Sequence, residues 1–141
     1  MKVETYVFFD GRTEEAIEFY RTAIGATDVQ IMRYKDSPEP AQPGMVPPGS
    51  ENKVMHSRFR VGETVIMASV GHNTGKPAFQ GFSLTVGTKT EGEARKLFDA
   101  LASGGKVNMP LTKTFFSPAF GMLADKFGVN WMVLVDTEQQ H

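Results

Sequence analysis

Hydrophobic and polar positions along the chain follow two patterns, one typical of strands and one typical of amphipathic helices. Val3 to Phe9 is β-branched and aromatic and stops at Asp10-Gly11, which predicts a strand. A helix follows, which Thr13 caps and Gly25 ends. Its apolar positions recur at helical spacing: Ala16, Phe19, Tyr20, Ala23 and Ile24. Val29 to Tyr34 is predicted as a second strand.

The middle and the end of the chain predict two hairpins and a second helix. Val54–Val61 and Thr64–Val70 are β-rich runs separated by Gly62-Glu63, which is typical of a tight hairpin. Thr90 with Glu93 forms a capping box at the start of a helix that ends before Gly104. Further strands are expected at residues 82–86, 106–108, 118–124 and 129–135. Residues 36–51 contain five prolines and are predicted as a loop, of a length that indicates a functional or interface role.

The two halves of the chain share this order of elements. Ala16, Phe19 and Tyr20 stand 78 positions before Ala94, Leu97 and Phe98, since 94 − 16, 97 − 19 and 98 − 20 all equal 78. The repeat favours an internal duplication within one domain, with module 1 at about residues 1–75 and module 2 at about 76–141. The alternative is an ordinary α+β domain with two unrelated amphipathic helices.

Composition and charge exclude several classes of function. The 141 residues suit one domain, and 40% hydrophobic residues are enough for a core. The absence of cysteine excludes disulfides, thiolate metal sites and a cysteine nucleophile. A net charge of −1 with scattered basic residues gives no reason to expect a nucleic-acid partner. The chain has no signal peptide and no long apolar stretch, so we expect a cytoplasmic protein without membrane contact.

Several segments together resemble a known superfamily. They are Tyr6 to Gly11, Ala16 to Tyr20, Val54 to His56, Ile66 to Ser69 and Phe120 to Trp131. The pattern resembles the vicinal-oxygen-chelate superfamily of glyoxalase I, extradiol dioxygenases and bleomycin resistance proteins. It is closest to the PhnB-like branch, also labelled 3-demethylubiquinone-9 3-methyltransferase-like. The resemblance implies an α+β fold in which two βαβββ modules form a cup-shaped eight-stranded mixed sheet around a ligand, and it implies a homodimer.

The resemblance also implies metal ligands, typically His and Glu, on the first and fourth strands of each module. Met67 and Met132 occupy the fourth-strand positions. Val3, Thr5 and Val7, and residues 82–86, offer neither imidazole nor carboxylate on the first strands. Thioether sulfur is a poor ligand for Mg²⁺, Mn²⁺ or Fe²⁺. We therefore expect no metal site of the family type and no cofactor.

A polar site is expected instead on the first hairpin. If Gly62-Glu63 is a two-residue turn, the numbers of opposed residues sum to 125, so that His56 faces Ser69 and Arg58 faces Met67. Alternation then gives two faces, one with His56, Arg58, Arg60, Met67 and Ser69 and one with Met55, Phe59, Ile66 and Ala68. The first face suits an anionic or carbonyl-bearing molecule. The alternative is a structural histidine beside solvated arginines.

The candidate site residues are assigned on this basis. His56 is the catalytic candidate, because imidazole exchanges a proton near neutral pH. The substrate-binding candidates are Tyr6, Phe8, Arg58, Met67, Ser69 and Met132. Tyr6 and Phe8 either wall the cup or pack in the core, and Phe115-Phe116 forms either a lid or a buried loop.

Four hypotheses for function follow. The first is a PhnB-like protein of unassigned reaction that binds a small molecule in the cup without the usual metal. The second is a metal-independent enzyme that uses His56 on a carbonyl substrate. The third is a metal-dependent lyase or dioxygenase. The fourth is a methyltransferase by family label only, since no glycine-rich loop for S-adenosylmethionine is present and Asp10-Gly11 is too short for that role.

Overall fold

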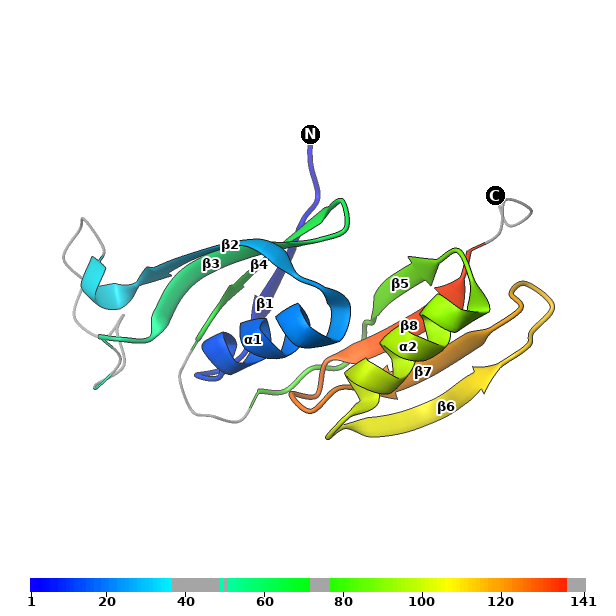
Figure 1. Ribbon diagram of the computed structural model, residues 1–141. Coiled ribbons are helices and arrows are strands. Elements are labelled where there is room, and N and C mark those ends of the chain that lie inside the picture. The colour runs from blue at the N-terminus through cyan, green and yellow to red at the C-terminus, as the bar shows by residue number, and fades with distance from the viewer. Residues whose placement is uncertain (37–48, 50, 72–76, 137–141) are drawn as a thin grey trace. The chain divides into compact units, whose positions relative to one another are not determined.

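The computed structural model describes residues 1–36, 49, 51–71 and 77–136, and the chain divides into two compact units, Met1–Pro77 and Ala78–His141. Most of the proline-rich stretch at residues 36–51 lies outside the described residues. Each unit contains one four-stranded mixed sheet and one long helix (Figure 1).

The first unit is a βαβββ arrangement with a short 3₁₀ turn. Its elements are β1 (Thr5–Phe8), α1 (Thr13–Ile24), β2 (Thr27–Arg33), η1 (Tyr34–Asp36), β3 (Val54–Val61) and β4 (Thr64–Ser69). The strand order is β1-β4-β3-β2, with β1 parallel to β4 and the other pairs antiparallel. Helix α1 lies against one face of this sheet (Figure 1) and buries Ala16, Ile17, Tyr20 and Ala23.

The hairpin of β3 and β4 has the predicted register next to its turn, and the predicted pair of His56 with Ser69 is not part of the ladder. The ladder runs from Val61 opposite Thr64 to Ser57 opposite Ala68, and every pair sums to 125. Gly62 has a φ of 57°, a left-handed conformation that glycine adopts without steric cost and that a two-residue turn requires. Phe59, Ile66 and Ala68 are buried, whereas Met55 is only half-buried. The hairpin and the burial of these three residues are therefore confirmed.

The predicted cap of the first helix is wrong. Thr13 is the first residue of α1 itself, and Arg12 occupies the N-cap position without a capping hydrogen bond from its side chain. The Thr13 side chain is fully buried, and its hydroxyl has no hydrogen-bond partner among the described residues. Asp10 and Gly11 have φ values of 51° and 99°, so the chain turns out of β1 before the helix begins. The predicted end at Gly25 is confirmed, with a φ of 71°.

The second unit follows the same plan. Its elements are β5 (Leu84–Thr88), α2 (Glu91–Ala102), β6 (Lys106–Thr112), β7 (Phe120–Ala124) and β8 (Asn130–Val135). The strand order is β5-β8-β7-β6, which corresponds position by position to the first sheet. Thr90 caps α2 as predicted, since its hydroxyl accepts a hydrogen bond from the amide of Glu93. The strand predicted at 82–86 lies two residues later, and the one predicted at 106–108 extends to Thr112.

Two further expectations concern aromatic residues in the second unit. Trp131, expected in the core, is buried on β8. Phe115 is fully exposed and Phe116 is partly exposed, with the Phe116 ring 5.1 Å from that of Phe120. The alternative of a buried loop at these residues is therefore wrong, and the lid stays a prediction.

The α+β class and the two βαβββ modules are confirmed by these elements. The duplication, the single domain and the cup built from both modules stay predictions. In the described part of the chain, no helix is long and apolar enough to cross a membrane.

Candidate functional site

The candidate site lies on the face of the first sheet that points away from α1. Alternation on β1 defines this face, because Val7 is 3% exposed whereas its neighbours Tyr6 and Phe8 are 38% and 57% exposed. We call this surface of the first unit the open face. Its residues are Tyr6, Phe8, Met32, His56, Arg58, Met67 and Ser69.

The strand register brings these residues into rows across the sheet. One row is Gln30, Arg58, Met67 and Tyr6, because each is directly opposite the next on the neighbouring strand. In the next row, Met32 is opposite His56 and Ser69 is opposite Phe8. The six predicted site residues of the first unit therefore share one face. They are Tyr6, Phe8, His56, Arg58, Met67 and Ser69.

A hydrogen bond joins the two most reactive groups of this face. The phenol oxygen of Tyr6 lies 3.0 Å from Nδ1 of His56, and their rings are 5.7 Å apart. The proton is on the phenol or on Nδ1 according to the tautomer of the imidazole. Sequence reasoning assigned Tyr6 and His56 separately but not this bond, because the register of the parallel pair β1 and β4 cannot be counted from a turn.

Aromatic and apolar groups surround this hydrogen-bonded pair. The ring of Phe8 lies 5.0 Å from that of Tyr6. Met67 is half-buried directly opposite Tyr6, and Ser69, which is mostly buried, is opposite Phe8. The alternative that Tyr6 and Phe8 pack in the core is wrong, since both rings are substantially exposed within this unit.

Tyr34 is a neighbour that sequence reasoning missed. It follows β2 in η1, and its amide donates a hydrogen bond to the carbonyl oxygen of Lys53. Burial, and to a smaller extent an electrostatic interaction with the nearby Tyr6 side chain, raise the pKa of the Tyr34 phenol above its ordinary value. Tyr34 therefore remains a neutral hydrogen-bond donor over the physiological range. Side chains of a strand alternate between its two faces, so a residue two positions after Met32 and four after Gln30 is expected on their face. This alternation is the sequence signal that could have identified Tyr34.

Met132 lies on the corresponding strand of the second unit. It is half-buried, opposite Thr85 of β5 on one side and Met122 of β7 on the other. Since it belongs to the other unit, its relation to the six residues of the first unit stays a prediction.

The residues at the family's metal positions do not suit a divalent cation. The first-strand residue beside Met67 is Tyr6, and the one beside Met132 is Thr85. From the sequence, Val7 is considered as one of the first-strand ligand positions. Its side chain is buried on the side of α1, so Val7 does not lie on the ligand-bearing face and this prediction is wrong. A phenol, a threonine hydroxyl and two thioethers lack the carboxylate and imidazole donors that such ions prefer. Over the described ranges, no three His, Asp or Glu side chains gather closely enough to hold an ion.

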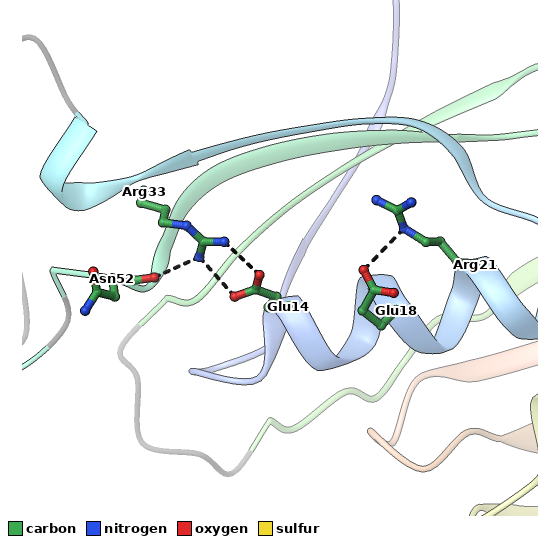
Figure 2. A network of polar contacts seen from close by, with 5 residues as sticks. All are labelled: Glu14, Glu18, Arg21, Arg33 and Asn52. Atoms are coloured by element: carbon green, nitrogen blue, oxygen red, sulfur yellow. Dashed lines mark hydrogen bonds and ion pairs between the residues drawn. The ribbon is translucent and has the colours of Figure 1, made fainter.

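A groove of about 420 Å³ lies along α1, and Glu14, one of its lining residues, is paired with Arg33. Arg33 donates to both carboxylate oxygens of Glu14, at 2.9 and 2.7 Å, and to the carbonyl oxygen of Asn52 at 2.8 Å (Figure 2). Glu18 pairs with Arg21 within the same helix at 3.3 Å. The Arg33 contacts join the first turn of α1 to β2 and to the segment before β3, so we assign this network to stability.

The Glu14–Arg33 pair predicts a pH-dependent contribution to stability. The hydrogen bonds and charge of Arg33 lower the pKa of Glu14 despite an opposing effect of burial. Because this pKa is lower in the folded state, the stabilisation is present above the ordinary value of 4.5 and is lost as pH falls through the folded value. We expect Glu14→Gln to lower the free energy of unfolding by less than about 1 kcal/mol at pH 7, because both side chains are partly exposed.

Urea denaturation at pH 7 and pH 3 checks this expectation. The difference between wild type and Glu14→Gln should be smaller at pH 3 than at pH 7, because the stabilisation by the Glu14 carboxylate declines as pH falls below 4.5 and through its lowered pKa. Glu18→Gln is the matched control, since among the described residues Glu18 pairs only with Arg21 of its own helix and the change should affect stability less at pH 7. An equal effect of both variants would contradict a bridging role for Glu14.

Comparison with known proteins decides the family. Residues 1–134 match the family described as 3-demethylubiquinone-9 3-methyltransferase. The chain belongs to this family. Protein YjdN of Escherichia coli K12 is 31% identical over 144 residues, which cover 99% of this chain and 98% of that protein.

Solved structures agree with this membership. Protein PA1353 from Pseudomonas aeruginosa is 37% identical with a TM-score of 0.81, over 96% of this chain and 98% of that one. A PhnB protein from Bacillus cereus, titled a putative 3-demethylubiquinone-9 3-methyltransferase, is 32% identical with a TM-score of 0.76, over 96% and 99%. The fosfomycin resistance protein FosX from Listeria monocytogenes shares the fold, with 8% identity and a TM-score of 0.65 over 99% and 96%. The resemblance to the vicinal-oxygen-chelate superfamily and its PhnB-like branch is confirmed.

Proposed function

We propose that this PhnB-like protein binds a small molecule on the open face of the first sheet, with Tyr6 and His56 as the polar centre. The hydrogen bond of 3.0 Å between the Tyr6 phenol and His56 Nδ1 carries this proposal. It fixes the orientation of both rings on a face that is otherwise aromatic and thioether-rich. A few placed polar groups within an apolar surround are the usual composition of a small-molecule site.

The surrounding side chains suit a compact organic ligand. The tilted rings of Tyr6 and Phe8 offer a surface for an aromatic or planar group. Met67 and Met32 adapt to irregular shapes, because their side chains are unbranched and polarizable. The proposal requires no metal ion, since the donor atoms at the family's metal positions do not suit one.

A metal-independent acid–base reaction on a carbonyl compound is the second candidate. The Tyr6–His56 bond favours it, because a phenol and an imidazole that share a proton can pass it to or from a carbonyl oxygen or an adjacent carbon. We do not propose methyl transfer. The connection between β1 and α1 is only residues 9–12 and contains a single glycine, which leaves no glycine-rich turn to hold a nucleotide-like cofactor.

Removal of the Tyr6 hydroxyl tests the site. Tyr6→Phe is expected to weaken binding of a site ligand by about 3- to 10-fold, the usual net value of one hydrogen bond. Ligands would come from a library of fragment-sized carboxylic acids, amides and ketones, and calorimetry would give each Kd. Thr22→Ala on α1 is the control, since it also removes one exposed hydroxyl from the same unit. Equal affinities of wild type and Tyr6→Phe for every library binder would contradict the proposal.

His56→Ala separates the two candidates. Incubation of each ketone that binds with wild type and variant, followed by NMR of the compound, reports conversion directly. Conversion by wild type that is lost in His56→Ala while binding is retained supports the acid–base enzyme. Binding without conversion in either protein supports a binding or sequestration role.

We further propose that the chain forms a homodimer. In the described residues, the first sheet ends at β1 and β2 and the second at β5 and β6, and exposed strand edges favour pairing with another chain. Light scattering should then give about twice the chain mass of 15.5 kDa. A mass of one chain at micromolar concentration would contradict it. The cytoplasmic location expected from the sequence stays a prediction.

A further inference from the structure

We infer that Arg58 forms an oxyanion subsite beside Tyr6 and His56, so that the ligand of the open face carries a carboxylate or a phosphate group. This inference rests on the proposed function, because it places the charged end of the same ligand. The observations behind it are the pairing of the charged side chains on β3 and a cavity beside the first residues of β2.

The charges around β3 leave one guanidinium without a counter-ion. Arg60 is paired with Asp28 across the strands, with 3.3 Å between Nε and Oδ2. The side chain of Arg58 has no hydrogen bond or ion pair with any described residue, although Arg58 lies between Gln30 and Met67 in the middle of the sheet. The Arg58 charge is therefore the one in this row that remains to be neutralised.

A cavity of about 310 Å³ opens beside this guanidinium. Its lining includes Arg58, Arg60, Gln30 and Asp28, so its charged side chains sum to one positive charge. A bulge in β2, between the positions of Thr27 and Gln30, shapes it, and Asp28 in the bulge has a φ of 51°. The Arg60–Asp28 pair holds this bulge against β3, which leaves Arg58 to face the cavity with a neutral amide opposite it.

The chemistry of the row suits an oxyanion. A guanidinium binds a carboxylate or phosphate through two parallel N–H donors, and the Gln30 amide can add a third. His56 and Arg58 are two residues apart on β3, a distance of about 7 Å along a strand. A planar molecule with an oxyanion at one end and a polar group at the other therefore spans the two positions.

Three matched probes test the charge directly. Benzoate, phenyl phosphate and benzamide share the phenyl ring, and benzamide replaces the benzoate charge with a neutral amide of the same shape. At constant ionic strength we expect at least one anion to bind wild type about 10-fold more tightly than benzamide, as charge-assisted hydrogen bonds are about twice as strong as neutral ones. The comparison of benzoate with phenyl phosphate identifies which oxyanion fits the cavity.

Arg58→Gln should abolish the preference for the anion and leave the Kd of benzamide unchanged. Arg21→Gln is the control, because it removes an exposed positive charge from α1 in the same unit. Equal losses of anion affinity in both variants would mean unspecific attraction and would overturn the subsite. Equal affinity of wild type for benzoate and benzamide would also overturn it.

The failures of the two proposals are distinguishable by the methyl resonance of Met67, which lies between Arg58 and Tyr6. If benzamide shifts this resonance as strongly as the anions do and Arg58→Gln changes nothing, the site stands and the anion subsite is refuted. If none of the three probes shifts it at millimolar concentration, the anion subsite is refuted, and the open face is then judged by the library measurements alone.

Discussion

Replacement of Asp125 by alanine is expected to lower the free energy of unfolding by about 3–5 kcal/mol, because it removes the carboxylate that accepts hydrogen bonds from three buried donors. One carboxylate oxygen accepts hydrogen bonds from the amides of Phe127 and Val129, at 2.9 and 3.1 Å. The other accepts from the indole N–H of Trp131 at 2.9 Å. Asp125 thus holds the turn between β7 and β8 and ties it to β8.

Urea denaturation followed by the fluorescence of Trp131, the single tryptophan of the chain, measures this loss at the place where it arises. Asp99→Ala is the matched control, since Asp99 is exposed on α2 and, within the part of the chain that the structure describes, pairs only with Arg95 at 3.7 Å. A change below about 0.5 kcal/mol is therefore expected. A loss below about 1 kcal/mol in Asp125→Ala would contradict the assigned hydrogen bonds.

Gly105→Ala is expected to destabilise the protein by about 3 kcal/mol or more. A β-carbon at this position would collide with the carbonyl oxygen of Ala124 and lie 2.8 and 2.9 Å from backbone carbons of Asp125. These are backbone atoms of the adjacent strand β7 and its turn, and they cannot move without breaking the pairing of Lys106 with Ala124. Overpacking against such a rigid neighbour has a high energetic cost.

Gly92→Ala on α2 gives the opposite expectation within the same unit. Nothing lies within 4 Å of a β-carbon built at Gly92, which is in the first turn of the helix. Alanine there should raise the free energy of unfolding by about 0.5–1 kcal/mol, because glycine is a poor helix former. The melting temperatures of the two variants should therefore move in opposite directions. A fall with Gly92→Ala, or no fall with Gly105→Ala, would contradict the packing described for this unit.

Local signals in the sequence were enough to predict the hairpin and its face. A two-residue turn at Gly62-Glu63 fixes the pairing of residues 57–61 with residues 64–68, and alternation then assigns each of them to a face. His56, Arg58 and Met67 could be grouped for that reason. The cap at Thr90 was equally local, since its partner Glu93 is three residues away.

Contacts set by tertiary packing were missed. β1 and β4 are parallel and joined through most of the unit, so no turn fixes Tyr6 opposite Met67, and the first-strand residues considered as metal ligands included the buried Val7. Thr13 has the residue type of a cap, but the turn at Asp10-Gly11 starts the helix at Thr13 and buries its side chain. The sequence predicts Tyr34 as the end of a strand, and its electrostatic interaction with Tyr6 exists only in the folded sheet.

The family membership shows the fold of the chain, whereas the site residues support the proposal about its function. The membership gives the fold and two βαβββ modules. On the open face, a phenol and an imidazole are hydrogen-bonded to each other, close to the positions where the family's metal ligands are expected. We therefore base the proposed function on these side chains and not on the methyltransferase label.

The most direct test of the open face is a methyl NMR map of bound fragments. Methionine and isoleucine methyl groups would be labelled, and library binders from the calorimetric screen would be titrated into the full chain. Met67 and Ile66 are adjacent in sequence and point to opposite faces of β4, so one reports on the open face and the other on the side of α1. We predict that binders shift the methyl resonances of Met67 and Met32 and leave Ile66 in place. Binders that leave Met67 and Met32 unmoved would contradict the proposal that this face is the binding site.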